Sequence, residues 1–428
     1  GDHRDLHYPL RRQRQMCIRD RFSSILEQND VAQVFDLFET YQKNSIYVVG
    51  GSIRDALLNR EITDIDFATS LKPKTITEIL NKENIKFIDV GIDHGTVTAI
   101  INERKFEITT FRNDIFTDGR HAQVSFSNSL EEDALRRDFT INAMYLDKGG
   151  NLIDPKDGKT DLENRVVRFI GNPDERIKED YLRILRYFRF LALFGDISPD
   201  AEVMKTIKAN LDKLSVVSKE RQWNELKSIL SLNAPNHAIS AMSEIGLLDV
   251  YFDGTSINDA FVNLIEIESR ISLSIDPILR LSTLIDNSLD KANTIIKKLP
   301  LSKSDSTDLL KLSTLNKKIV SYMSMKEVRY LLYLLGRDGF QKQILVNWAK
   351  DTNNKNEVNW RSLYEVAQSW EKPSFALTAK DVINMGISQG PMVGDILKEV
   401  EDWWAENDFI DDKFSLIERL KAIVQSKK

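Results

Sequence analysis

Three acidic residues, Asp64, Asp66 and Glu107, carry the clearest chemistry in this sequence. Asp64 and Asp66 stand two positions apart within residues 62–69, whose pattern predicts a β-strand, so both carboxylates should leave one face of that strand. Glu107 belongs to a second predicted strand at residues 105–111. Three carboxylates can hold two Mg²⁺ ions about 3.5–4 Å apart, one beside an attacking 3′-hydroxyl and one across a triphosphate and its leaving pyrophosphate. The arrangement therefore predicts metal-dependent nucleotidyl transfer.

The glycine pair Gly50-Gly51 would place a phosphate-binding turn beside these acids. An apolar, β-branched run at residues 46–49 predicts a buried strand, and a helical pattern follows at residues 53–58. The glycines therefore lie in a strand-to-helix turn, where backbone N–H groups can bind phosphate oxygens. Arg54, in the first turn of the helix, is a second candidate for phosphate binding.

The elements around these motifs predict a small unit of mixed strands and helices that ends near residue 150. Helical patterns cover residues 22–43 and 73–80, and residues 96–101 pair with residues 105–111 as a hairpin. Beyond this unit the pattern is helical, apart from a short strand predicted at residues 166–170. A chain of 428 residues is too long for one compact core, so several domains are expected.

Composition places few limits on the partners of this chain. The net charge of −6 and the isoelectric point near 5.6 argue weakly against nucleic acid, but arginines gather locally in several motifs. No apolar run in the sequence approaches the length of a membrane span. Cys17 is the single cysteine, which excludes an intramolecular disulfide and favours a reducing, cytoplasmic location. No protein partner can be inferred from these features.

Residues 1–21 look foreign to the rest of the chain. They are rich in arginine and show neither a helical nor a strand period. A basic nucleic-acid arm or a transit peptide would have a similar composition. The tract resembles translated sequencing-adaptor read-through, and we expect it to be no part of the fold.

Five motifs between about residue 45 and residue 230 resemble, in order, those of the class II tRNA nucleotidyltransferase and bacterial poly(A) polymerase family. They are GGSIRDALLNREITDIDFATS, FEITTFR, EEDALRRDFTINAM, DPKDG and ERIKEDYLRILRYFRF. The resemblance implies an α+β fold in which a small polymerase-β-like head is followed by an elongated, all-α neck, body and tail. It also implies template-independent addition of CMP and AMP, from CTP and ATP, to the 3′ end of tRNA.

The resemblance divides the chain into five segments. We expect the foreign tract at residues 1–21, the catalytic head at 22–150, a neck with base recognition at 151–215, a body at 216–300 and a tRNA-binding tail at 301–428.

A basic motif ahead of an apolar segment adds candidate nucleotide ligands to the head. In Arg136-Arg137-Asp138 the arginines can donate bidentate hydrogen bonds to phosphates of the triphosphate and the primer. The family suggests that Asp138 accepts from the ribose 2′-hydroxyl. A helix start carrying surface arginines is the alternative.

Asp180 and Arg183 are expected to choose the base. On one continuous helix they would share a face, where they form either an ion pair worth about a few tenths of a kcal/mol or a template for the base. Cytosine and adenine both present an amino donor beside a ring-nitrogen acceptor, which a carboxylate and a guanidinium can pair with. Uracil and guanine present the reverse order and would leave both protein groups unpaired. Arg186 extends the same stripe toward phosphates.

The tail contains a glycine-rich turn that resembles one found in family members. Gly390 and Gly394 flank Pro391 where a helix is expected to begin, which is a reasonable site for an RNA backbone phosphate.

Three other functions compete with CCA addition. Poly(A) polymerases of the family usually carry a basic stretch after the strand with the two aspartates, and residues 87–95 are not basic, which favours tRNA. A specialist that adds only A or only CC shares nearly every motif. An RNA-binding protein without catalysis would lack a carboxylate, and all three are present.

Overall fold

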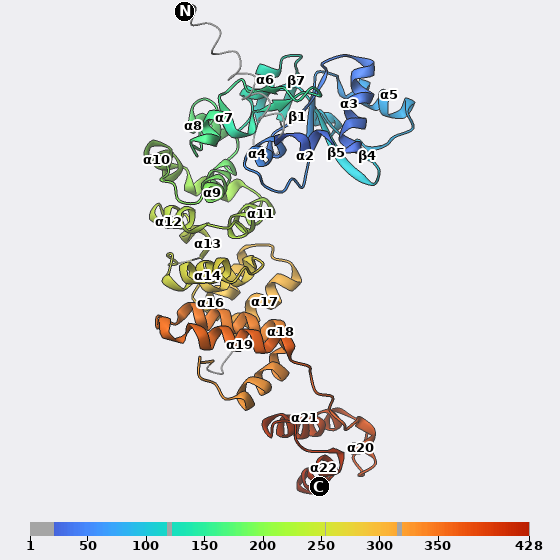
Figure 1. Cartoon of the computed structure of the whole chain (residues 1–428), viewed down its shortest axis with the longest axis vertical. Coiled ribbons are helices and arrows are strands. Elements are labelled where there is room, and N and C mark those ends of the chain that lie inside the picture. The colour runs from blue at the N-terminus through green and yellow to red at the C-terminus, as the bar shows by residue number, and fades with distance from the viewer. Residues whose placement is uncertain (1–20, 118–121, 253, 315–318, 428) are drawn as a thin grey trace, which may run out of the picture. The chain divides into compact units, whose positions relative to one another are not determined.

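The computed structural model describes residues 21–117, 122–252, 254–314 and 319–427. They form two compact units (Figure 1): one runs to Ile229 and includes His237–Leu247, and the other holds Leu230–Asn236 and the chain from Leu248 onward. The tract predicted to be foreign lies outside the described residues except for Arg21, which donates a hydrogen bond to the Leu57 carbonyl. The segment borders predicted at residues 150, 215 and 300 stay predictions.

A seven-stranded mixed sheet forms the centre of the first unit, with the strand order β3-β4-β5-β2-β1-β8-β9. Its strands are β1 (Ile46–Val49), β2 (Asp66–Thr69), β3 (Lys86–Ile88), β4 (Thr96–Ile101), β5 (Arg104–Thr110), β8 (Tyr145–Leu146) and β9 (Leu152–Ile153). Neighbouring strands are antiparallel except β2 and β5, which are parallel. The predicted hairpin is confirmed as β4 and β5, whose turn holds Asn102 and Glu103 at positive φ. A separate ribbon of β6 (Arg112–Thr117) and β7 (Ala122–Phe126) follows β5.

Helices surround this sheet and continue beyond it in the first unit. They are α2 (Ser23–Leu26), α3 (Asn29–Tyr41), α4 (Gly51–Leu57), α5 (Pro73–Lys82), α6 (Leu130–Leu135), α7 (Gly158–Glu163), α8 (Pro173–Glu179), α9 (Arg183–Phe194), α10 (Ala201–Ala209), α11 (Lys219–Leu230) and α12 (Asn236–Glu244). The strand predicted at residues 166–170 is wrong, because only one isolated bridge, between Phe139 and Phe169, forms there.

Alternation along β5 separates the core of the head from its functional face. Phe106 and Ile108 are fully buried, whereas Glu107 between them is exposed on the opposite face. The core face is covered by α3, where the Phe35 ring meets the edge of Phe67 at 5.4 Å and Phe67 lies 5.9 Å from Phe106. The sheet is therefore fixed from one side, and Glu107 is left free to face a ligand.

The second unit is helical throughout its described residues. Its helices are α13 (Asp249–Phe252), α14 (Asp259–Arg270), α15 (Pro277–Leu284), α16 (Leu289–Lys298), α17 (Lys303–Thr314), α18 (Met325–Lys350), α19 (Glu357–Ser369), α20 (Ala379–Ile383), α21 (Pro391–Glu406) and α22 (Lys413–Lys427). A buried ion pair joins Arg280 to Glu268 at 2.6 Å, and Arg280 also donates to the carbonyls of Leu230 and Leu232. Together the two units confirm the predicted α+β class. None of the helices in the described parts of the chain has the length and apolar character needed to cross a bilayer.

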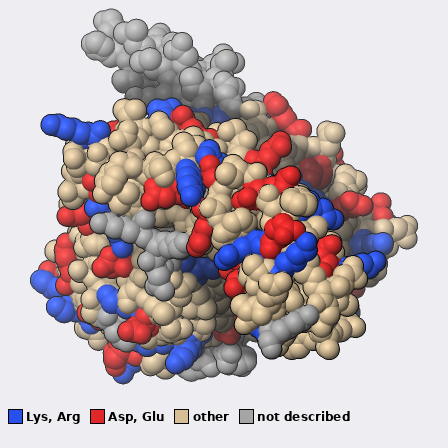
Figure 2. Space-filling model, turned by 90° about the horizontal axis from the view of Figure 1, so that it is seen from below, with Lys and Arg blue, Asp and Glu red and all other residues tan. Residues whose placement is uncertain are grey.

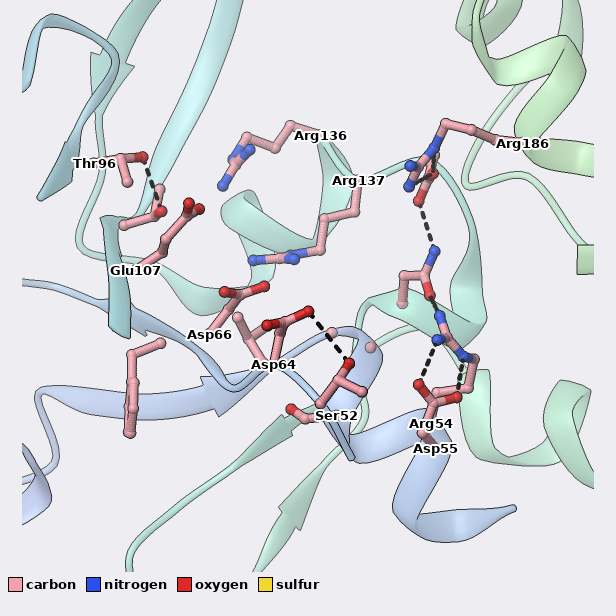
Figure 3. A pocket seen from close by; sticks show the side chains of 18 of the residues that line it. Ser52, Arg54, Asp55, Asp64, Asp66, Thr96, Glu107, Arg136, Arg137 and Arg186 are labelled. Carbon is pink, nitrogen blue, oxygen red and sulfur yellow. Dashed lines mark hydrogen bonds and ion pairs between the residues drawn. The ribbon is translucent and has the colours of Figure 1, made fainter. Parts of the chain in front are cut away.

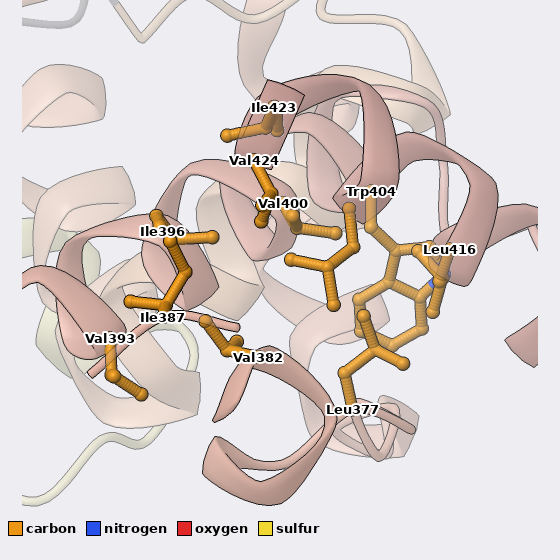
Figure 4. Packing of buried hydrophobic residues seen from close by; sticks show 11 residues of the cluster. Leu377, Val382, Ile387, Val393, Ile396, Val400, Trp404, Leu416, Ile423 and Val424 are labelled. Atoms are coloured by element: carbon orange, nitrogen blue, oxygen red, sulfur yellow. The ribbon is translucent and has the colours of Figure 1, made fainter. Parts of the chain in front are cut away.

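The last three helices pack around their own apolar cluster (Figure 4). Val382 of α20, Val400 of α21 and Leu420 of α22 are buried in it together with the indole of Trp404. Gly390 immediately precedes α21 and Gly394 is its fourth residue; among the described residues, no atom apart from their chain neighbours and the helix's own backbone lies within 4 Å of where a Cβ would stand at either. The backbone at this turn is therefore open to a partner.

Candidate active site

A cavity of about 550 Å³ opens on the face of the sheet opposite α3. Its lining includes the three predicted carboxylates, Asp64, Asp66 and Glu107, which point into the same space (Figure 3). Six further residues predicted for nucleotide binding also line it: Gly50, Gly51, Arg54, Arg137, Asp138 and Arg186. Asp180 and Arg183 are not part of the lining, and Gly390 and Gly394 belong to the second unit.

Strand register explains why the carboxylates converge. Val49 of β1 pairs with Asp66 of β2, so the glycine turn that follows β1 begins beside Asp66. The parallel pair β2 and β5 aligns Phe67 with Ile108, which brings Asp66 and Glu107, each one residue earlier, to neighbouring positions. Asp64 precedes β2 instead of lying on it, because the strand begins at Asp66 and not at residue 62 as predicted.

The crowding of negative charge shows in the pKa of Asp66. Burial, followed by the charges of Glu107 and Asp64, raises this pKa to about 6, and the nearby Arg137 guanidinium opposes the rise. In the described parts of the chain no three acidic, histidine or cysteine side chains already stand at the spacing of a closed metal cage. Carboxylates that repel one another would be drawn together by a divalent cation, and their oxygens are the ligands that Mg²⁺ prefers. The donor set therefore fits this ion.

We expect nucleotide addition to fall as the pH is lowered through about 6, the pKa of Asp66, because protons compete with a metal for its carboxylate. The activity midpoint, measured from kcat/KM between pH 5 and 8, should move to lower pH when the metal concentration is raised; a fixed midpoint would contradict the assignment.

Since the folded pKa lies above the ordinary value of 3.8, Asp66 stabilises the metal-free fold at low pH, and this contribution is lost as the pH rises through about 6. The free energy of unfolding of Asp66→Asn, measured by urea titration, should not show this fall as the pH rises.

The glycine turn is built as predicted. Gly50 adopts φ 79°, ψ −127°, a conformation that only glycine adopts readily, and α4 begins at the next residue. The Ser52 hydroxyl is buried in the cavity wall without a hydrogen-bond partner among the described residues, so a ligand oxygen can satisfy it. Arg54 is already engaged, since its guanidinium donates to Asp55 at 2.8 and 3.0 Å and to Asn142 at 2.8 Å.

A buried carboxylate that the sequence reasoning missed holds two of the cavity arginines. Asp133 of α6 is fully buried and pairs with Arg136 at 2.6 Å and Arg137 at 2.9 Å, and the Tyr145 hydroxyl donates to it at 2.7 Å. Burial alone would raise the pKa of Asp133, but the two arginines hold it below its usual value. The spacing of three and four residues on a helix was the only signal in the sequence.

Asp138 connects the head to α9. One of its oxygens accepts from the Phe139 backbone N–H and from Asn142, and the other accepts from Arg186 at 2.7 Å. Burial would raise the pKa of Asp138, yet Arg186 and the hydrogen bonds bring it far below the usual range. Through Asn142 this network reaches Arg54, and Figure 3 shows it along one side of the cavity.

The predicted pairing of Asp180 with Arg183 on one helix is wrong. The helix α8 ends at Glu179, Asp180 has extended backbone angles, and α9 begins at Arg183. Arg183 instead pairs with Glu179 at 2.7 Å, and Asp180 pairs with Arg221 at 2.6 Å. Arg183 remains close to the cavity, because it donates to the carbonyl of Arg136 at 3.5 Å. Burial would lower the pKa of Arg186, but Asp138, Glu225 and, to a smaller extent, Asp180 raise it.

Basic and acidic side chains are intermingled on the face drawn in Figure 2, in keeping with the net charge of −6. That face as a whole therefore does not attract phosphate. Positive charge that can do so is concentrated in the cavity, whose lining includes Arg136, Arg137, Arg186 and Arg189.

Two stretches of this chain match known protein families, and relatives match much of its length. Residues 46–168 match the poly A polymerase head domain, and residues 196–257 match the probable RNA and SrmB-binding site of polymerase A. The mitochondrial CCA tRNA nucleotidyltransferase 1 of Danio rerio is 32% identical over 397 residues, which is 90% of this chain and 89% of the relative. A CCA-adding enzyme of Streptococcus gordonii is 42% identical over 232 residues, covering 53% of this chain and 56% of that protein.

Solved structures share the fold. The CCA-adding enzyme of Bacillus stearothermophilus in complex with CTP superposes with a TM-score of 0.72 at 23% identity, covering 95% of this chain and 98% of that one. The Thermotoga maritima CCA-adding enzyme complexed with tRNA gives a TM-score of 0.61 at 19% identity, covering 94% and 98%. Because a relative at 32% identity is matched over 89% of its length, the chain belongs to the class II tRNA nucleotidyltransferase and bacterial poly(A) polymerase family.

Proposed function

We propose that this protein adds CMP and AMP, from CTP and ATP, to the 3′ end of tRNA without a nucleic-acid template. The supporting observation is one cavity that gathers Asp64, Asp66 and Glu107 among six arginines, in a chain whose relatives are named CCA tRNA nucleotidyltransferase or CCA-adding enzyme. Structures with this fold have been solved with CTP, with ATP and with tRNA.

Each group of cavity residues has a task in this reaction. The turn at Gly50-Gly51, with the Ser52 hydroxyl, binds phosphate oxygens, and the arginines held by Asp133 balance the charge of the triphosphate. Asp64, Asp66 and Glu107 would hold Mg²⁺, which when bound supplies Lewis-acid stabilisation of charge on the phosphoryl oxygens. Attack of the 3′-hydroxyl on the α-phosphorus forms the new ester and breaks the bond to pyrophosphate.

Asp138 remains a candidate for the ribose 2′-hydroxyl. Its Oδ1 accepts from the Phe139 N–H and from Asn142, and its Oδ2 lies 2.7 Å from Nε and 2.5 Å from Nη2 of Arg186, so a ribose hydroxyl would share an oxygen with these donors. The same bonds fix its orientation.

Base choice rests on Asp180 and Arg183 in this proposal. Replacement of Asp180 by alanine removes the acceptor for the amino group of cytosine and adenine, so the preference for CTP over UTP in kcat/KM should fall about tenfold or more. Competition assays with all four nucleoside triphosphates measure this preference. Unchanged exclusion of UTP and GTP would remove the templating role.

The experiment that tests the function uses Mg²⁺, labelled CTP or ATP, and tRNA lacking its 3′ terminus. Ordered addition of the CCA triplet supports the proposal. A long A tail would instead identify a poly(A) polymerase, and addition of A alone or CC alone a specialist. Failure to incorporate either nucleotide would contradict all three activities.

Residues 301–428 are assigned the tRNA-binding tail, with backbone phosphates placed at Gly390 and Gly394, where no atom of the described residues, apart from chain neighbours and the helix's own backbone, lies within 4 Å of an ideal Cβ. The division into head, neck, body and tail belongs to the same proposal. The cytoplasmic location expected from the sequence stays a prediction, and the relatives from Danio rerio, Mus musculus and Homo sapiens are named as mitochondrial.

A further inference from the structure

Helix α11 sends two charged side chains toward the nucleotide-binding residues of the first unit. Arg221 and Glu225 lie four residues apart on this helix and therefore share a face. Arg221 donates to Asp180 at 2.6 Å, while Glu225 lies 2.7 Å from Arg189 and 3.5 Å from Arg186, both of which line the cavity. Helix α11, which does not line the cavity, thus contacts two cavity arginines of α9 and also Asp180, which lies just before α9 and outside the lining.

Asp180 depends on such support because of its place in the chain. It lies between α8 and α9 with extended backbone angles, so no helical turn orients its side chain. One carboxylate oxygen accepts from the Leu182 backbone N–H at 3.1 Å, and the other accepts from Arg221. Since each carboxylate oxygen carries two lone pairs, each still has one to offer to the amino group of a base.

We propose that Arg221 is a positioning residue for nucleotide choice, acting by holding the Asp180 carboxylate in the orientation that accepts from cytosine or adenine. This inference rests on the proposed role of Asp180 in base reading. The Asp180 side chain is 21% exposed, so without the guanidinium its carboxylate can rotate toward water. A freely rotating carboxylate no longer imposes one hydrogen-bonding pattern on the incoming base.

Glu225 gives a contrast on the same helix. Its carboxylate is 12% exposed and touches two arginines of the cavity, not the base-reading aspartate. Glu225→Gln should therefore raise KM for all four nucleoside triphosphates by a similar factor and leave the preference among them unchanged. Arg221→Met should instead change the preference among the four nucleoside triphosphates without raising KM for all of them by a similar factor.

The test compares kcat/KM for CTP and UTP on tRNA lacking its 3′ terminus. Arg221→Met is expected to lower the CTP to UTP ratio about tenfold, the size associated with one lost hydrogen bond to a charged group, while kcat with CTP changes less than about threefold. Arg221→Lys, which keeps a charged donor, should recover part of the ratio. Lys219→Met removes an exposed cation two residues earlier on α11 and is the matched control, with an unchanged ratio expected.

A double variant separates action through Asp180 from direct contact with the nucleotide. In an Asp180→Ala background, adding Arg221→Met should leave the ratio where Asp180→Ala alone put it. A further fall of similar size, or an unchanged ratio in the single variant, would overturn the inference. Wild-type protein that does not distinguish CTP from UTP would instead refute the proposed function. If the methionine variant is unfolded by circular dichroism, Arg221→Gln is judged by the same criteria.

Discussion

Replacing Asp66 with asparagine is expected to slow nucleotide addition about 10³-fold or more while tRNA affinity changes little. Asp66 stands between Gly50 and Glu107 at the centre of the acidic group. The substitution removes the carboxylate whose pKa is raised by burial and by the charges of Glu107 and Asp64. A metal's stabilisation of the transition state is worth several kcal/mol, and each loss of about 1.4 kcal/mol costs a factor of ten. Single-turnover rates with labelled CTP, and a gel-shift titration with tRNA, measure the two quantities.

Asp89→Asn is the matched control for that substitution. Asp89 is an exposed aspartate just after β3 and is absent from the cavity lining, so its removal should leave both rate and affinity within about twofold. If Asp66→Asn retained turnover within tenfold of wild type, the carboxylates would not hold the catalytic metal. Loss of tRNA binding together with turnover would point to misfolding of the head.

Elements set by local chemistry were predictable from the sequence. The Asn102-Glu103 turn, the strand ending at Val49 and the helix beginning at Pro73 follow from turn residues, β-branched runs and the preference of proline for a first helical turn. Periodicity also places Glu107 on the face opposite Phe106. The convergence of Glu107 with Asp66 depends on the parallel pairing of β2 and β5, which the sequence pattern alone does not specify.

The break between α8 and α9 shows why local reasoning fails at residues 180–182. Glu179, Tyr181 and Arg183 would all continue a helix, but the Asp180 side chain accepts from the Leu182 backbone N–H and competes with the helical bond. Its second oxygen is then free for a partner distant in sequence, Arg221. A contact of that kind has no signature in a single sequence.

Asp133→Asn is expected to destabilise the head by about 3–5 kcal/mol and to raise KM for both CTP and ATP. The carboxylate is fully buried, and the side chains of Arg136 and Arg137 that it pairs with are only 15% and 17% exposed. Removing one partner of a buried ion pair leaves uncompensated charge, and here two guanidinium groups lose the same acceptor. Asparagine keeps the size of the side chain, so the loss reports charge and not a cavity. Urea titration measures the free energy of unfolding, and steady-state kinetics measures KM.

The neighbouring Glu131→Gln separates this effect from a general loss of negative charge on α6. Glu131 is exposed two residues earlier on the same helix, so its substitution should change the free energy of unfolding by about 0.5 kcal/mol or less. If Asp133→Asn were as stable as wild type with an unchanged KM, the two arginines would be oriented by something other than Asp133. A rise in KM without destabilisation would still support the proposal that Asp133 orients the two guanidinium groups toward the triphosphate. It would show that this effect on binding is separate from their contribution to the stability of the fold.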